Sequence, residues 1–291
     1  MISEAITYID PFDRETWIQV GMALRDELGD DGFDIWDAWS SQAANYDPKC
    51  MATQWRSFRG TGITIRSLYY LAKQNGWEGQ GEAPRNDTPR RHYEWEREEA
   101  VRHERARRVA MRAIGDASYE THPYLARKGF PDEKGLVLRG MLLIPMRDMR
   151  TMQQVNSAQY IDADGTKKFL PGGKAKGSVF PIGRGPETYL CEGYATGLSV
   201  RDALASLYQK ARVVVCFSAA NVAYVAQSVG DYVIADHDAS KTGEKYAEKT
   251  GLPWWMPPSI GDANDFHQSE SIRALAEEIR RMRSGGRFRA A

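Results

Sequence analysis

Short apolar runs alternate with longer segments of helical periodicity in the last third of the chain. Each run has the length of a strand, and the segment after it carries apolar residues at three- and four-residue intervals. Such runs are found at residues 188–191, 213–217, 232–235 and 252–256. Strands and helices that follow one another in this order form a doubly wound parallel sheet. We therefore predict an α/β domain over residues 187–283, followed by a disordered tail at 284–291.

The preceding segment, residues 118–186, has the pattern of a smaller α+β subdomain. An apolar run at 140–148 predicts a buried strand, and a turn at 162–165 separates two segments that can pair as a hairpin. Four lysines lie on this hairpin and on the glycine-rich loop after it: Lys167, Lys168, Lys174 and Lys176. They predict a strip of ammonium groups, and the alternative is a solvated sheet edge that lysines protect from aggregation.

The first 77 residues predict a separate, small all-α domain. Asp13 is a suitable N-cap for a helix with apolar residues at helical spacing, and Gly29 is a suitable stop. Tryptophans are concentrated here, and we interpret them as the core of a small domain. A surface that stacks the bases of single-stranded nucleic acid is the alternative. A linker at 78–92 and a highly charged helix at 93–117 are expected to follow.

Composition limits the class of protein. The 291 residues are 42% hydrophobic and contain 39 basic and 39 acidic residues, so any nucleic-acid surface must be local. No apolar run approaches the roughly 18 residues of a membrane span, and the N-terminus lacks the pattern of a signal peptide. The cysteines form no CxxC pair, which argues against a zinc ribbon. We expect a soluble cytoplasmic protein with no membrane partner.

Carboxylates follow the predicted strands at one edge of the sheet. Glu192 follows the first strand, Asp236 and Asp238 follow the third, and Asp262 and Asp265 lie in the loop before the last helix. The carboxyl ends of parallel strands meet at the edge where open α/β sheets bind ligands. Mg²⁺ prefers carboxylate oxygens together with substrate phosphates, and two such ions can assist a phosphoryl transfer. The pattern predicts a magnesium site, with Mn²⁺ as the alternative ion.

Three stretches of the N-terminal segment carry a family resemblance. They are Trp17-Ile18-Gln19-Val20-Gly21-Met22-Ala23-Leu24, Gly32-Phe33-Asp34-Ile35-Trp36-Asp37-Ala38-Trp39-Ser40 and Trp55-Arg56-Ser57-Phe58. This segment resembles the primase C-terminal (PriCT) type of helical domain, which is often found next to primase catalytic domains. The resemblance implies an accessory role in replication and names no catalytic residue.

A second resemblance covers roughly residues 119–268. Its motifs are His122-Pro123-Tyr124-Leu125, Arg147-Asp148, Lys167-Lys168-Phe169, Cys191-Glu192-Gly193-Tyr194-Ala195-Thr196, Asp236-His237-Asp238 and Asp262-Ala263-Asn264-Asp265-Phe266. The acidic motifs look like the Toprim domain shared by DnaG-type primases, topoisomerases and some nucleases. The whole set resembles the Toprim primases of phages and conjugative plasmids.

The resemblance implies a role for each matching residue. Glu192 would be the acid–base or metal-linked carboxylate, Asp236 and Asp238 metal ligands, and Asp262 and Asp265 supporting acids. Contacts to nucleotide or template phosphates are implied for Arg147, Lys167, Lys168, Lys174 and Lys176. Gly193 and Gly197 would let backbone and substrate approach closely. The implied partners are single-stranded DNA and nucleoside triphosphates, and the implied location is the cytoplasm of a bacterial host cell.

The sequence departs from this family in two ways. It has neither the zinc-binding domain of DnaG-type primases nor a Walker phosphate loop, so any replicative helicase is expected to be a separate protein. Our leading hypothesis is a primase that makes short primers in phage or plasmid replication. A Toprim nuclease remains an alternative, since it needs the same acids but not the segment 140–182. A noncatalytic DNA-binding accessory protein, acting in replication or against host defence, is another.

Overall fold

The computed structural model describes residues 1–43, 46–58, 63–79 and 88–285. The chain folds as two compact units, Met1–Val101 and Arg102–Ala291, and the division falls within helix α6 (Thr88–Asp116). Residues 80–87 of the predicted linker and 286–291 of the predicted tail lie outside the described residues. In the described part of the chain, no helix is long and apolar enough to cross a membrane.

The first unit is helical, as predicted. Its elements are α1 (Ile2–Ala5), η1 (Ile6–Tyr8), α2 (Arg14–Leu28), η2 (Gly29–Gly32), α3 (Phe33–Ser40), α4 (Pro48–Ser57) and α5 (Ile65–Gln74). Asp13 caps α2 by accepting a hydrogen bond from the Thr16 amide at 3.0 Å, and Gly29 ends the helix with a φ of 59°. Both helix boundaries follow the sequence signals.

Tryptophan side chains form the core of this unit. Trp36, Trp39 and Trp55 are buried, and the ring centroids of Trp36 and Trp55 lie 5.5 Å apart. The indole N–H groups of Trp36 and Trp39 donate to backbone carbonyl oxygens at 3.1 and 2.9 Å. Buried rings whose polar groups are satisfied cannot stack on nucleic-acid bases. For these three tryptophans the structure therefore supports the core interpretation.

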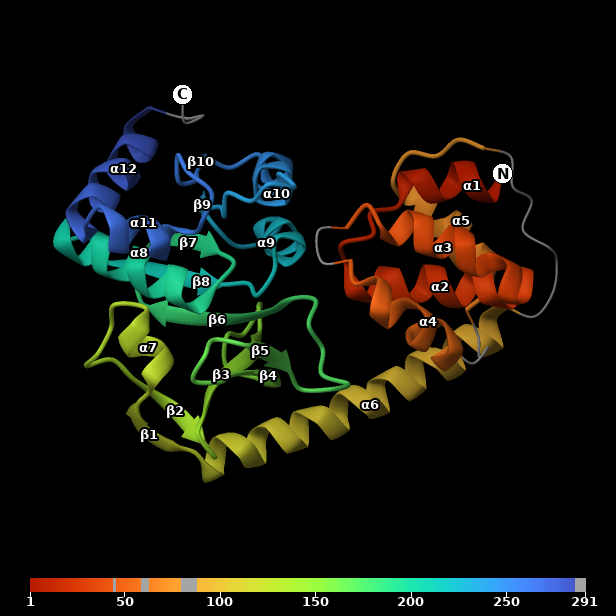
Figure 1. The fold of residues 1–291 in the computed structure, drawn as a ribbon, viewed down its shortest axis with the longest axis horizontal. Coiled ribbons are helices and arrows are strands. Elements are labelled where there is room, and N and C mark those ends of the chain that lie inside the picture. Colours follow the sequence, from red (N-terminus) through yellow and green to blue (C-terminus); the bar gives the residue numbers. More distant parts are fainter. Residues whose placement is uncertain (44–45, 59–62, 80–87, 286–291) are drawn as a thin grey trace. The chain divides into compact units, whose positions relative to one another are not determined.

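The second unit is a ten-stranded mixed sheet with helices on both faces (Figure 1). Its strands are β1 (Ser118–Thr121), β2 (Lys134–Leu138), β3 (Met141–Asp148), β4 (Val155–Ile161), β5 (Lys167–Phe169), β6 (Ser178–Gly183), β7 (Glu187–Cys191), β8 (Ala211–Val215), β9 (Tyr232–Ile234) and β10 (Trp254–Trp255). Its helices after α6 are α7 (Pro123–Arg127), α8 (Tyr194–Ser206), α9 (Ala219–Ala226), α10 (Thr242–Thr250), α11 (Ala263–Ser269) and α12 (Ile272–Gly285). Helix α12 thus continues into the segment predicted to be disordered.

The predicted parallel sheet is present in the order β8-β7-β9-β10. Strand β7 pairs in parallel with both β8 and β9, and β9 pairs in parallel with β10. The chain passes from β7 to β8 on one side and later returns to β9 on the other. A topological switch point therefore lies between β7 and β9, which is where open α/β sheets bind ligands.

Alternate residues of the parallel strands supply two cores. Tyr189, Cys191 and Val213 pack on the side of α8 and α12, whereas Leu190 and Val214 pack on the side of α9 and α10 (Figure 1). Side chains of successive strand residues point to opposite faces, so a strand covered on both faces must be apolar throughout. This explains why the sequence of these strands shows continuous rather than alternating apolar runs.

The antiparallel part of the unit joins the same sheet. Strand β6 pairs antiparallel with β8 and with β3, so the segment predicted as a subdomain shares a continuous sheet with the parallel part. Strands β4 and β5 form the predicted hairpin, with Lys167 opposite Ile161. Ala110 and Ala113 of α6 pack in a core cluster with apolar residues of β3 and β4. The hairpin is thereby held on the sheet that carries the acids.

Candidate metal and nucleotide site

Two carboxylates meet at the switch point. Glu192 directly follows β7, and Asp236 follows β9 after one further residue. The paired register of Cys191 and Ile234 brings the ends of these two strands side by side. A small hollow between α9 and α10 is lined by both carboxylate residues and by apolar side chains that include Val222. The parallel sheet therefore places two acids from distant parts of the sequence in one partly apolar site.

The carboxylates of this site repel one another. Burial raises the pKa of Asp236 to about 8, and the charges of Glu192 and Asp262 contribute to the rise. Burial also raises the pKa of Glu192, against the opposing charge of Lys167, and Asp238 adds to the rise. Oδ1 of Asp236 is buried and has no hydrogen-bond partner among the described residues. A buried oxygen without a donor is costly, and a bound cation would satisfy it.

Unlike Oδ1 of Asp236, both carboxylate oxygens of Asp238 accept hydrogen bonds. Its Oδ1 accepts hydrogen bonds from the amides of Ser240 and Thr242 at 2.8 and 3.3 Å, and its Oδ2 accepts one from Gly243 at 3.0 Å. Burial raises the pKa of Asp238, but the hydrogen bonds from Ser240 and the backbone outweigh it, so the pKa lies below its usual value. Asp238 is therefore an ionised carboxylate fixed at the start of α10.

Gly243 is a site residue that sequence reasoning missed. A Cβ atom on Gly243 would lie 2.0 Å from the carbonyl oxygen of Asp236. Only glycine lets the start of α10 approach the strand end so closely. The signal in the sequence is a short polar turn with a glycine, which follows directly after the Asp-x-Asp motif.

Asp262 and Asp265 have different surroundings. Asp262 caps α11, and its Oδ1 accepts hydrogen bonds from the amides of Asn264 and Asp265 at 2.7 and 2.9 Å. Its charge raises the pKa of both Glu192 and Asp236, so it belongs to the same cluster. Asp265 is exposed, completes the capping box and forms a 3.3 Å ion pair with Lys128, the C-cap of α7. No described contact brings Asp265 to Asp236.

Lys167 is the lysine that reaches the acids. Its Nζ lies 3.9 Å from the position that a Cβ atom on Gly193 would occupy, and its charge opposes the pKa rise of Glu192. Phe169, two residues on, contacts Phe217 at the carboxyl end of β8, with ring centroids 6.2 Å apart. Since side chains alternate along a strand, Lys168 points to the opposite face. Of these two adjacent lysines, Lys167 is the one with a described position beside the acids.

Two other basic residues, Lys174 and Lys176, lie on the glycine-rich loop after the hairpin, and Arg147 lies near the end of β3. The Lys176 ammonium lies 5.1 Å from the centroid of the Tyr224 ring. Burial, together with the charges of Arg102 and Lys174, lowers the pKa of His103. Arg147 donates to the carbonyl oxygen of Gln153 at 2.8 Å and is thus engaged in its own turn.

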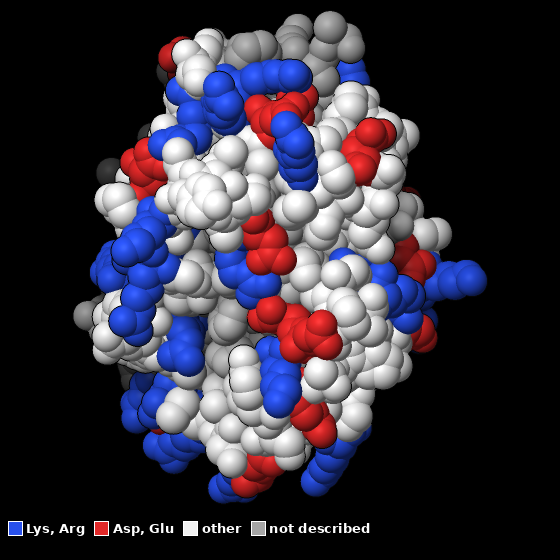
Figure 2. All heavy atoms as spheres, turned by 90° about the vertical axis from the view of Figure 1, so that its left-hand side faces the viewer, with Lys and Arg blue, Asp and Glu red and all other residues white. Residues whose placement is uncertain are grey.

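Among the described residues, the lysines of the basic loop and hairpin form no close ion pair, although Lys167 lies near the acids. Within the described residue ranges no ion pair involves any of four lysines, Lys167, Lys168, Lys174 and Lys176. By contrast, the face that carries α7, α8 and α12 mixes basic and acidic side chains (Figure 2). There Arg201 pairs with Glu133 at 2.9 Å and Arg281 with Glu278 at 2.6 Å. A phosphate backbone is therefore better matched by the loop and hairpin than by this face.

The predicted role of Gly197 beside the substrate is wrong. A Cβ atom there would lie 2.9 Å from Cγ2 of Val215 and 3.0 Å from Cδ1 of Ile182, both in the core. Gly197 therefore allows α8 to pack closely on the sheet and does not face a ligand. Gly193, at the N-cap of α8, retains the predicted position beside the acids.

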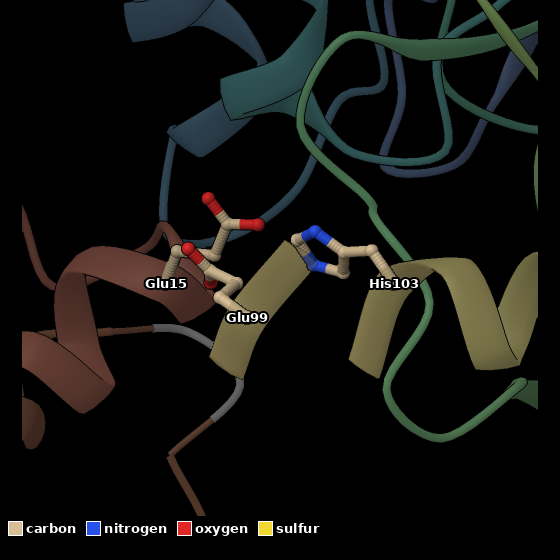
Figure 3. Close-up of side chains that lie close together, drawn as sticks. All are labelled: Glu15, Glu99 and His103. Carbon is tan, nitrogen blue, oxygen red and sulfur yellow. The ribbon is translucent and has the colours of Figure 1, made fainter. Parts of the chain in front are cut away.

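Figure 3 labels three side chains that lie outside this site. Glu15 comes from α2, and Glu99 and His103 come from α6, where a four-residue spacing places them on one face (Figure 3). Glu15 and Glu99 belong to the first unit, whereas His103 belongs to the second. Because the group spans the division between the two units, it is not a candidate site.

Comparison with known families identifies the N-terminal segment. Residues 2–72 match the family model Primase C terminal 2 (PriCT-2). This match confirms the predicted resemblance of the helical segment to primase C-terminal domains.

Comparison with characterised proteins extends the relationship into the second unit. An alignment of 186 positions, which covers 58% of this chain, is 29% identical to DNA primase TraC from Escherichia coli. The chain spans only 12% of the length of that relative. Together with the PriCT-2 match, this similarity confirms the predicted resemblance to primases.

Two solved structures from bacteriophage T7 are also similar to this chain. The primase fragment of the T7 primase-helicase protein has a TM-score of 0.40 and 17% identity, with 57% of this chain and 77% of that chain covered. The second is a chain from a structure in which the T7 lagging-strand DNA polymerase interacts with primase domains bound to an RNA/DNA hybrid and dTTP. It has a TM-score of 0.40 and 16% identity, with 59% of this chain and 93% of that chain covered.

Proposed function

We propose that this chain is a metal-dependent, primase-like nucleotidyltransferase that makes short primers from nucleoside triphosphates on single-stranded DNA, in phage or plasmid replication. The observation that carries the proposal is the convergence of Glu192, Asp236 and Asp262 at the switch point, with Lys167 reaching the same place. The proposal is supported by the similarity to a protein named as a DNA primase. The basic loop beside the hairpin supplies a surface for the template.

The residues present fit a hard divalent cation. Asp236, Asp238 and Glu192 would hold Mg²⁺ or Mn²⁺, with Asp262 as a supporting acid, because oxygen donors suit these ions. Oδ1 of Asp236, which has no partner in the described structure, is the best placed ligand atom. His237 is not free to take part through Nδ1, which donates to the carbonyl oxygen of Pro257 at 2.9 Å. When bound, the metal would neutralise charge that develops on the phosphoryl oxygens.

The side chains of this chain supply the remaining steps. The 3′-oxygen of one nucleotide forms a bond to the α-phosphorus of the next, the bond to the β-phosphate breaks, and pyrophosphate leaves. The carboxylate form of Glu192, which its raised pKa makes more basic, accepts the proton of the attacking hydroxyl. Lys167 binds the triphosphate, and Lys174 and Lys176 bind template phosphates as point charges. Asp265 and Lys168 have no part in this scheme.

Incorporation of labelled nucleoside triphosphates on unprimed single-stranded DNA tests the proposal. The native protein is compared with the Asp236→Ala, Asp238→Ala variant and with Asp132→Ala, an exposed acid of the same unit, as the matched control. Each is assayed in Mg²⁺, in Mn²⁺ and in EDTA. We expect metal-dependent product from the native protein and the control, and a loss of about 100-fold or more in the double variant.

Other outcomes point to the alternatives. Metal-dependent cutting of the DNA without incorporation would replace the proposal by a Toprim nuclease. Binding of DNA with neither activity would favour an accessory protein that acts without catalysis. Equal incorporation by the native protein and the double variant would place the active site elsewhere.

A further inference from the structure

A buried amide ties α11 to two other elements. Asn264 is fully buried, and its Nδ2 donates to the carbonyl oxygen of Lys128 at 2.8 Å and to Oγ of Ser199 at 3.0 Å. Its Oδ1 accepts a hydrogen bond from Gln268 at 3.0 Å, and Ser199 is bonded in turn to Nδ1 of His267 at 3.1 Å. A single side chain thus connects the end of α7, the middle of α8 and the first turn of α11.

This connection fixes the acid at the start of the same helix. Asp262 is the N-cap of α11, and the backbone N–H of Asn264 donates a hydrogen bond to Oδ1 of Asp262 at 2.7 Å. The backbone of Asn264 holds the carboxylate of Asp262, while its side chain holds the helix against α7 and α8. Loss of the side-chain bonds would free the first turn of α11 to shift. Asp262 would then move relative to Asp236.

A second buried amide holds the basic loop. Oδ1 of Asn221 accepts a hydrogen bond from the amide of Gly177 at 2.8 Å. Its Nδ2 donates to the carbonyl oxygens of Ser178 and Cys216 at 2.8 and 2.7 Å. The end of the loop is therefore fastened to the strand end of β8. The first turn of α9 is capped separately by Ser218, so it does not depend on these side-chain bonds.

Two further contacts support the same loop. Oγ of Ser178 donates to the carbonyl oxygen of Lys174 at 2.8 Å, and Nδ2 of Asn156 donates to that Oγ at 2.9 Å. Lys174 and Lys176 are thus carried on a backbone that is fixed at its end by Asn221. Buried hydrogen-bond networks of this kind specify one arrangement of the chain.

We propose that Asn264 and Asn221 are positioning residues for two separate parts of the site: Asn264 sets the acid cluster, and Asn221 sets the basic loop. The inference rests on the proposed function, because it takes the acids as the metal centre and the loop as the template surface. It adds that the two parts are positioned independently, since the two hydrogen-bond networks share no residue.

Variants of the full-length chain test this separation. Asn264→Ala and Asn221→Ala are compared with the native protein by calorimetric titration with Mn²⁺ and by fluorescence anisotropy with labelled oligo-dT in EDTA, well below the unfolding temperature. We expect Asn264→Ala to weaken Mn²⁺ binding about tenfold and leave the DNA affinity within about twofold. We expect Asn221→Ala to weaken DNA binding about tenfold and leave Mn²⁺ affinity within about twofold. Each variant serves as the matched control of the other.

A general loss of stability would weaken Mn²⁺ binding and DNA binding in the same variant, and such a result would overturn the inference. Unchanged affinities in both variants would also overturn it. If either alanine variant fails to fold, Asn264→Ser and Asn221→Ser replace them, since serine retains a hydroxyl donor at the buried position. A native protein that binds no Mn²⁺ would instead overturn the proposed function, so the two failures are distinguishable.

Discussion

The ammonium group of Lys167 lies 3.9 Å from the point where a Cβ atom on Gly193 would stand. Lys167 belongs to the β4–β5 hairpin, and Gly193 is the N-cap of α8, directly after Glu192. The antiparallel part of the sheet therefore delivers a cation to the acids that end the parallel strands. Opposite charges from the two parts meet where a nucleoside triphosphate and its metal would bind.

The alternation of side chains on β5 leads to a first prediction. Lys167→Gln should lower nucleotide incorporation about tenfold to 100-fold, because a charge-assisted contact worth about 1.5–3 kcal/mol is lost. Lys168→Gln should stay within about threefold of the native rate, since its side chain points to the other face. Steady-state incorporation over a range of nucleotide concentrations measures both. Equal losses in the two variants would contradict the assignment.

Replacement by alanine should affect stability at Gly197, within α8, and nucleotide binding at Gly193, the N-cap of α8. Gly197→Ala should lower the free energy of unfolding by about 1–3 kcal/mol, since its Cβ would crowd Val215 and Ile182 in the core. The nearest atom to a Cβ on Gly193 is Oγ1 of Thr196, at 3.2 Å, so Gly193→Ala should fold almost normally. Its methyl group would stand 3.9 Å from Nζ of Lys167, and we expect about a tenfold rise in the KM for nucleotide.

Urea denaturation and nucleotide kinetics separate these two effects. A stable Gly197→Ala protein would show that α8 can move away from the sheet at little cost. A Gly193→Ala protein with native KM would show that substrate does not pass the start of α8.

Burial of Asp236, together with the charges of its neighbouring acids, predicts that this residue is kept at the expense of stability. The raised pKa of Asp236 means that its ionised form is less favourable in the folded than in the unfolded chain. Because the pKa of Asp236 is about 8 in the folded chain, folding at pH 7 must either protonate this carboxylate or bury its charge, and Asp236→Asn removes that cost. The variant should therefore have a free energy of unfolding in EDTA that is higher by about 0.5–2 kcal/mol. Mg²⁺ should stabilise the native protein and have little effect on the variant. Urea denaturation at pH 7 with EDTA or Mg²⁺ measures both, and a less stable variant in EDTA would contradict the account.

Sequence patterns predicted the features that depend on neighbouring residues. The apolar runs identified β7, β8 and β9, and the acids at their ends followed from the rule that parallel strands share a carboxyl edge. The ion pair of Asp265 with Lys128 depends on how the end of α7 packs on α11, and the residues next to Asp265 in the sequence do not indicate this packing. The hydrogen bond from Asn264 to Lys128 joins residues 136 positions apart, so it could not be anticipated.

The N-terminal unit gives a prediction about packing. A Cβ atom on Gly21 of α2 would lie 2.4 Å from Cε2 of Phe58 and 2.7 Å from Nε1 of Trp36. Gly21→Ala should therefore destabilise this unit by about 1–3 kcal/mol. Tryptophan emission during urea denaturation should shift to longer wavelength at a lower urea concentration than in the native protein. Gly29→Ala is not a suitable control because its φ is positive. Gly115→Ala, in the second unit, is suitable, since no atom of the described residues lies within 4 Å of its Cβ position.

Anomalous diffraction from crystals that contain Mn²⁺ and a non-hydrolysable nucleoside triphosphate tests the central claim most directly. The account predicts a manganese peak within about 2.5 Å of Oδ1 of Asp236, with Glu192 or Asp238 as a further ligand and the triphosphate beside Lys167. A manganese peak away from these carboxylates, or a triphosphate bound elsewhere with no metal at the switch point, would contradict it.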